Sequence, residues 1–161
     1  MRKGFTLVEL LVVFGIMIAI SAIVFANLAG KRSNTDLTAT TQQVATLLRQ
    51  AQSDAVAQEN GAAQGSSVSW GVHFSNTTTT QPFYALFTGS YGATTTVGYY
   101  LLPPTVAYRT STLAAGATLD VIFSPITGAA SVSTSIGFYM PEENAAFSST
   151  ISVASSGAVS Y

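Results

Sequence analysis

A long apolar stretch near the N-terminus constrains this chain more than any other feature. It runs from Phe5 to Ala29, and Glu9 is its only ionisable residue. As a helix it would measure about 37 Å, more than the roughly 30 Å of hydrocarbon in a bilayer. The basic pairs Arg2-Lys3 and Lys31-Arg32 flank it on either side. This pattern predicts a transmembrane helix over residues 5–29.

Glu9 is an unusual residue for such a stretch. A carboxylate in hydrocarbon costs about 2.5–3.5 kcal/mol, so it is taken by default as a functional residue with a partner. Protonation could neutralise it, or a positive group supplied from elsewhere. A free terminal amine would do so best where the local dielectric is low, and the pair would favour subunits packed in one register. A head-to-tail contact of this kind that does not close generates a filament.

The first nine residues carry a family resemblance. Met1-Arg2-Lys3-Gly4-Phe5-Thr6-Leu7-Val8-Glu9 resembles the processing signal of type IV pilins and type II secretion pseudopilins. The resemblance implies that Arg2 and Lys3 belong to a basic leader. It also implies that a membrane-embedded prepilin peptidase cuts between Gly4 and Phe5 on the cytoplasmic side and methylates the Phe5 amine. Glu9 would then attract the Phe5 amine of a neighbouring subunit during assembly.

Shorter blocks are similar to one group within that family, the GspH/FimT-like pseudopilins. They are Leu48–Val56 followed by Trp70-Gly71-Val72, then Phe123–Gly128 and Ile151–Gly157. The chain has no Cys, whereas many major pilins close their C-terminal region with a disulfide. The helix has no Pro, which many pilins carry. The missing Pro favours a minor pilin or pseudopilin over a major pilin.

The layout expected from the pattern has four parts. Residues 1–4 form the leader, 5–29 the transmembrane and filament-core helix, 30–60 an amphipathic second half of the same helix, and 61–161 a β-rich head. The second half is indicated by apolar residues at helical spacing, which would form one stripe: Leu37, Val44, Leu47, Leu48, Ala51 and Ala55. Asn60-Gly61 supplies a stop signal, so one helix is expected from Phe5 to about Glu59. Two helices joined by a hinge at residues 30–34 are the alternative.

After Ser67 the pattern changes to short strands separated by turn residues. The expected strands are Val68–Phe74, Phe83–Phe87, Val97–Leu102, Leu119–Phe123, Ala130–Thr134, Ile136–Met140 and Ile151–Ala154, with a last piece near Val159. Strands without intervening helices imply an antiparallel sheet, and the helical stripe is available to cover it. The predicted fold is therefore α+β: a pilin-like lollipop with a long N-terminal helix, half of it transmembrane, packed on one antiparallel sheet.

The sequence offers little chemistry. His73 is the only histidine, and Cys-based metal sites or nucleophiles are impossible without Cys. Two acids, Glu142-Glu143, do not make a calcium loop. We therefore expect no catalytic residue, no metal and no cofactor, and hence no enzyme. Only Arg49 and Arg109 are basic after Thr35, so nucleic-acid binding is not favoured.

Two classes of function remain. The first is a structural subunit of a type IV pilus-like filament or type II secretion pseudopilus. Its partners would be the prepilin peptidase, other pilin or pseudopilin subunits and an inner-membrane assembly platform. The second is a single-span, membrane-anchored binding domain without a filament. A DNA-binding minor pilin of an uptake system is a further alternative. The first class implies a single pass through the inner membrane with an extracytoplasmic head, then a pilus or periplasmic pseudopilus.

Overall fold

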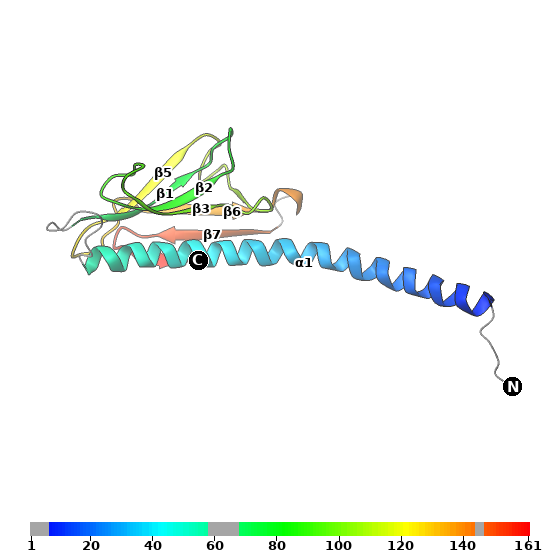
Figure 1. Cartoon of the computed structure of the whole chain (residues 1–161). Helices are drawn as coiled ribbons and strands as arrows, with labels where there is room; N and C mark the ends of the chain where they lie inside the picture. Colours follow the sequence, from blue (N-terminus) through cyan, green and yellow to red (C-terminus); the bar gives the residue numbers. More distant parts are fainter. Residues whose placement is uncertain (1–6, 58–67, 144–146) are drawn as a thin grey trace.

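Within the part of the chain that the structure describes, one long helix and eight strands make up the fold. The computed structural model describes residues 7–57, 68–143 and 147–161, with the backbone alone for residues 24–34 and 143. The helix α1 (Leu7–Val56) is followed by the strands, and a short 3-10 helix η1 (Pro141–Glu143) precedes β7. The C-terminal half of α1 lies along the strands, and its N-terminal half projects beyond them (Figure 1). The molecule is therefore elongated, with a β-rich head at one end.

The strands form two antiparallel sheets of four strands each. In the first sheet the order is β3-β2-β1-β5, with β1 (Trp70–Ser75), β2 (Phe83–Thr88), β3 (Thr96–Leu101) and β5 (Thr118–Phe123). In the second sheet the order is β4-β6-β7-β8, with β4 (Ala107–Tyr108), β6 (Thr134–Tyr139), β7 (Ser148–Val153) and β8 (Val159–Ser160). Neighbouring strands in both sheets run antiparallel.

The prediction of one sheet is wrong because the chain crosses between two sheets three times: before β4, after β4 and again after β5. A tight turn over residues 124–128 follows β5, and only an isolated bridge between Phe123 and Ala130 continues the first sheet. The expected strand Ala130–Thr134 is therefore absent, and β6 begins at Thr134 and pairs with β7 instead. The strand β4 was not expected, since two residues are too short to show an alternating pattern.

The apolar stripe of α1 lies in the core between the two sheets. Each of its six predicted residues is buried: Leu37, Val44, Leu47, Leu48, Ala51 and Ala55. The helix packs against β1 and β5 of the first sheet and against β6, β7 and β8 of the second. The buried side chains of both sheets form one apolar cluster with this stripe. The predicted apolar stripe is therefore the face that α1 buries.

The backbone of α1 continues without a break through residues 30–34, so the alternative with a hinge is wrong. The helix ends at Val56, three residues before the expected end, and Asn60-Gly61 lies outside the described residues. The backbone amide of Ile126, in the turn after β5, donates a hydrogen bond to the carbonyl of Ala55 at 3.2 Å. A partner from another part of the chain thus satisfies one of the last helical carbonyls, which have no partner within the helix.

The structure contradicts the prediction of a transmembrane helix. Across residues 7–57, 68–143 and 147–161, no helix combines the length and the apolar character needed to cross a membrane. The transmembrane helix over 5–29, the lollipop built on it and the single-pass inner-membrane localisation are therefore wrong as predicted.

The buried stripe generates a first prediction, on stability. Leu48 has no exposed surface, so Leu48→Ala should lower the free energy of unfolding by about 2–5 kcal/mol through lost burial and an internal cavity. The matched control is Gln50→Ala, on the exposed side of the same helix, with an expected change within about 0.5 kcal/mol. Chemical denaturation of both variants measures the difference. Equal stability would show that this stripe does not hold the head together.

Buried tyrosines generate a second prediction, on alkaline stability. Burial, followed by the neighbouring Tyr100, raises the pKa of Tyr84 to about 12, whereas an unfolded tyrosine titrates near 10. The neutral phenol is thus favoured in the folded protein. Its contribution to stability is complete below pH 10 and is lost as the pH rises towards 12. Tyr84→Phe should flatten this fall in denaturation measured between pH 8 and 11.5, and Tyr161→Phe, at an exposed ring, serves as the control.

Candidate assembly surface

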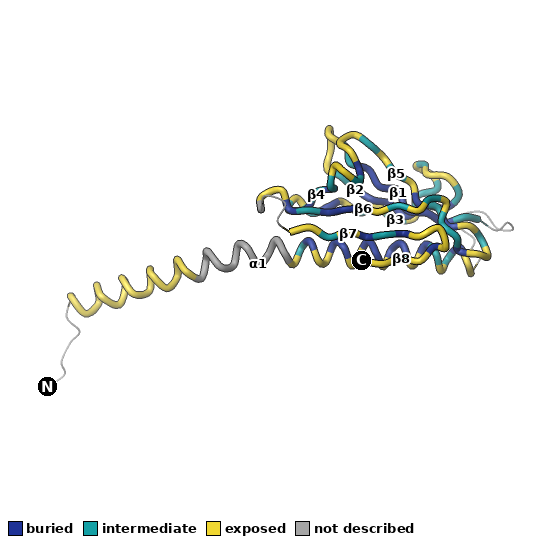
Figure 2. The backbone as a smooth tube through the Cα atoms, turned by 180° about the vertical axis from the view of Figure 1, so that it is seen from behind, coloured by how far each residue is buried: buried dark blue, intermediate teal, exposed yellow. Residues whose placement is uncertain are grey.

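The N-terminal half of α1 presents a continuous apolar surface to solvent. Twelve large apolar side chains lie between Leu7 and Ile23, and all are at least half exposed, from 50% at Val13 to 82% at Leu7. Figure 2 shows this half in the colour of exposed residues along its described length, clear of the head. Monomeric proteins rarely expose apolar patches larger than a few hundred Å². We therefore take residues 7–23 as the candidate assembly surface.

The assembly surface is apolar around the whole helix and is not confined to one stripe. Residues 10–14 read Leu-Leu-Val-Val-Phe, which is more than one full turn. A Cβ added at Gly15 would meet nothing within 4 Å, so this part of the helix has no close neighbour. A helix that is apolar on all sides is one that is normally surrounded by apolar partners. Several partners, placed around the helix, are needed to cover it.

Glu9 is the one ionisable residue of the assembly surface. It lies in the first turn of α1, where the helix dipole favours a negative charge, and its side chain is exposed. The proposed pairing residue is therefore on the same surface as the apolar side chains. Gly4, Phe5, Arg2 and Lys3 fall outside the described residues, so their roles in cleavage, methylation and pairing remain predictions.

At the other end of α1 lies a strained turn, which we call the tip turn (residues 124–128). Thr127 N donates to the carbonyl of Pro125 at 2.7 Å, and the φ angle of Ile126 between them is 69°. A bond spanning three residues with a positive φ at its centre is the rare, strained form of γ-turn. Such a backbone costs of order 1–3 kcal/mol. The Ile126 side chain is 63% exposed, so it contributes little burial in return.

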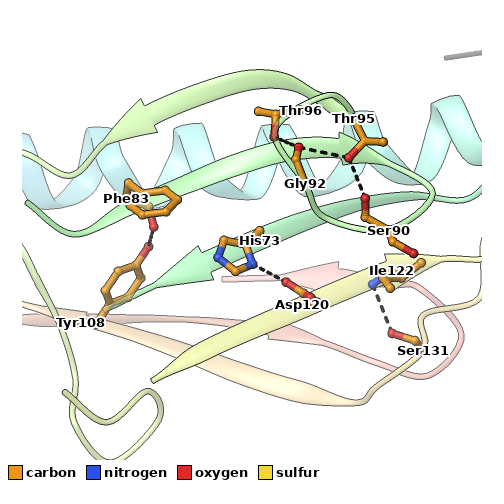
Figure 3. A network of polar contacts seen from close by, with 10 residues as sticks. All are labelled: His73, Phe83, Ser90, Gly92, Thr95, Thr96, Tyr108, Asp120, Ile122 and Ser131. Atoms are coloured by element: carbon orange, nitrogen blue, oxygen red, sulfur yellow. Dashed lines mark hydrogen bonds and ion pairs between the residues drawn. The ribbon is translucent and has the colours of Figure 1, made fainter. Parts of the chain in front are cut away.

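His73 has a charged partner that sequence reasoning missed. Its Nδ1 lies 2.5 Å from a carboxylate oxygen of Asp120 on the neighbouring strand (Figure 3). The ring also stacks on Tyr91, with centroids 3.6 Å apart and planes 1° from parallel. The register of β1 and β5 places His73 opposite Asp120, and only a correct strand pairing could have shown this. In the residues that the structure describes, no group of three possible metal ligands includes this pair.

The basic residues of the head do not form a nucleic-acid-binding face. Arg49 Nη2 donates to the carbonyl of Val159 at 3.1 Å, and its guanidinium lies 5.2 Å from the Tyr161 ring centre. Arg109 follows β4 on the second sheet, where its side chain covers Gly137. Each arginine thus packs locally. The described head offers no cluster of cations for phosphates.

An open groove of about 630 Å³ lies on the second sheet. Its lining consists of small and hydroxyl-bearing residues, without a titratable group: Ser111, Thr112, Ser133, Thr134, Ser135, Ser152, Val153, Ala154, Ala158 and Ser160. General acid–base catalysis needs a group that titrates near the working pH, and this lining has none. Glu142 is exposed in η1, away from this lining.

Comparison with known proteins adds no family to this picture. Searches against protein-family models, curated proteins and solved structures find no match to the chain. The surfaces described above are therefore the features of this chain that indicate a function.

Proposed function

We propose that this chain is a structural subunit of a type IV pilus-like filament or type II secretion pseudopilus, in the manner of a minor pilin or pseudopilin. It acts by assembly and not by catalysis. One observation carries the proposal: residues 7–23 form a helix that is apolar on all sides and uncovered by the rest of the described chain. The N-terminal motif from Met1 to Glu9 supports the pilin-like character of the assembly.

The apolar surface is large enough to drive association. Burying an exposed Leu, Ile, Val or Phe contributes about 1.5–3 kcal/mol. The twelve side chains are already about half buried by their own helix, so covering the rest supplies roughly 10–20 kcal/mol. Association costs an estimated 4–15 kcal/mol. Neighbouring half-helices packed around one another therefore give a favourable balance.

In this assembly, Glu9 fixes the register, which is the axial offset between neighbouring helices. Apolar helices can slide past each other with little change in buried area, whereas an ion pair holds only at one offset. A Glu9 carboxylate paired with the Phe5 amine of the next subunit would select that offset. Each subunit then offers one carboxylate and one amine, so the same contact repeats along the assembly.

The other candidate functions have less support. The anchored binding domain requires a ligand site on the head, and the described groove there is lined by small and hydroxyl-bearing residues without a titratable group. A DNA-binding subunit requires a cationic face, and the arginines of the head are engaged at separate places. No observation favours either function over assembly.

The assembly surface generates a prediction on subunit incorporation. Glu9→Gln keeps size and hydrogen bonding but removes the charge, so the chain should reach normal abundance while its co-purification with partner subunits falls at least about tenfold, equivalent to 1.4 kcal/mol. Glu142→Gln, at an exposed carboxylate of the head, should leave incorporation unchanged. Ile16→Asp, in the middle of the surface, should abolish incorporation because it places a charge in an apolar contact.

These variants separate the parts of the proposal. Normal incorporation of Glu9→Gln would exclude the ion pair while leaving apolar assembly intact. Normal incorporation of Ile16→Asp would overturn assembly through residues 7–23.

The leader generates a prediction on processing. Gly4→Val places a branched side chain at the proposed cleavage site, so a prepilin peptidase should leave Met1–Gly4 attached. Mass spectrometry of the N-terminus should find N-methylated Phe5 in the unchanged protein and an intact Met1 in the variant. Thr6→Ser, beyond the cleavage site, is the matched control. Efficient cleavage of Gly4→Val would remove the basis for a pilin-like maturation.

A further inference from the structure

We propose that Ile126 of the tip turn is a second contact site, which packs on the apolar half-helix (residues 7–23) of another copy of this chain. The inference rests on the proposed function, because it adds a head contact to the helix contacts of the same assembly. Within the tip turn, the backbone geometry at position 126 does not suit an isoleucine.

The conflict is that Ile126 occupies a backbone conformation that suits glycine. Among the described residues, positive φ angles otherwise occur only at glycines: Gly89, Gly116, Gly128 and Gly157. A β-branched residue at positive φ is a genuine outlier, whereas glycine or asparagine adopts this region readily. Its exposed side chain does not offset the strain by burial within the subunit. A contact outside the subunit would account for the isoleucine.

The surrounding structure holds the tip turn firmly in this strained form. Ser124 N donates to Ala129 O at 2.8 Å, and Gly128 N donates to Ser124 O at 2.9 Å. From the helix, the Gln52 side-chain amide donates to Gly128 O at 3.3 Å, and Ile126 N donates to Ala55 O. Strained conformations that are over-determined in this way concentrate at functional positions. The turn thus holds the projecting side chain of Ile126 in a fixed position.

The apolar half-helix of another copy is the occupant that fits this side chain. The tip turn contains no charged residue, and neither does the half-helix from Leu10 to Ile23. Val56, 47% exposed, lies beside the turn, because its side chain is within 2.8 Å of a Cβ built at Gly128. Ile126 and Val56 together form a small apolar knob, and such a knob fits between the ridges of a helix surface.

The position of the two surfaces makes the contact repeat. The knob is at the C-terminal end of α1 and the half-helix is at the N-terminal end (Figure 1). A contact between opposite ends of identical molecules is heterologous, and it extends from copy to copy instead of closing. One knob is far smaller than a standard interface of about 800 Å² per partner. It therefore adds to the packing of the half-helices and positions the heads relative to them.

The test compares stability and assembly in the full chain expressed in its own host. Ile126→Asn and Ile126→Gly suit a positive φ, so the melting temperature should stay at or rise above that of the unchanged protein. Sedimentation of assembled material should fall by roughly fivefold, as expected for one lost apolar contact. Ile126→Val keeps both strain and contact and should behave as the unchanged protein. Val97→Thr, at a side chain of similar exposure (58%) on β3, should not affect assembly.

A photo-crosslinking residue at position 126 identifies the occupant. Adducts that map to residues 7–23 of a second copy are expected, and none is expected from the same group at position 97. A lower melting temperature of Ile126→Gly and Ile126→Asn, undiminished assembly of these variants, or adducts elsewhere would each overturn the inference and leave the proposed function standing. Failure of the unchanged protein to assemble would overturn both.

Discussion

The burial of the α1 stripe between two sheets is the interaction on which the rest of this structure depends. Residues such as Leu48 and Val44 have no exposed surface and contact the inner side chains of both sheets in one cluster. Four-stranded antiparallel sheets need a cover for their apolar faces. One helix serves both, so loss of its stripe would uncover two sheets at once. The tip turn, which gives Ala55 a hydrogen-bond donor, belongs to the same arrangement.

The two halves of α1 differ in the kind of partner that they can satisfy. The half under the head has one apolar stripe and meets a partner from its own chain. The half from Leu7 to Ile23 is apolar on every side, and the described part of the chain leaves it exposed. A single helix thus joins a half that its own head covers to a half that the described chain leaves exposed. In the proposed assembly, other copies cover the second half, and the charge of Glu9 selects one of several packings that bury similar apolar area.

Local sequence patterns predicted the helix and most strands. They did not predict features that depend on contacts between residues far apart in the sequence. The stripe from Leu37 to Ala55 was predicted correctly because helical spacing is visible in the residues themselves. The division into two sheets was missed because it depends on which strands pair after β3, β4 and β5, and local patterns do not show strand pairing. The pairing of His73 with Asp120 depends on strand register, and the strain at Ile126 on hydrogen bonds from other segments. The predicted membrane span rested on local hydropathy alone, and no helix in the described part of the chain meets the requirements of a span.

The unbroken backbone of α1 through residues 30–34 has a mechanical consequence. A continuous helix transmits rotation and translation along its axis, whereas a hinge would absorb them. The head packs on one face of the same helix, so the orientation of the exposed half determines the orientation of the head. In the proposed assembly, side-by-side packing of the exposed halves would therefore fix the height and azimuth of each head relative to the next. The order of the heads would then follow from the order of the helices.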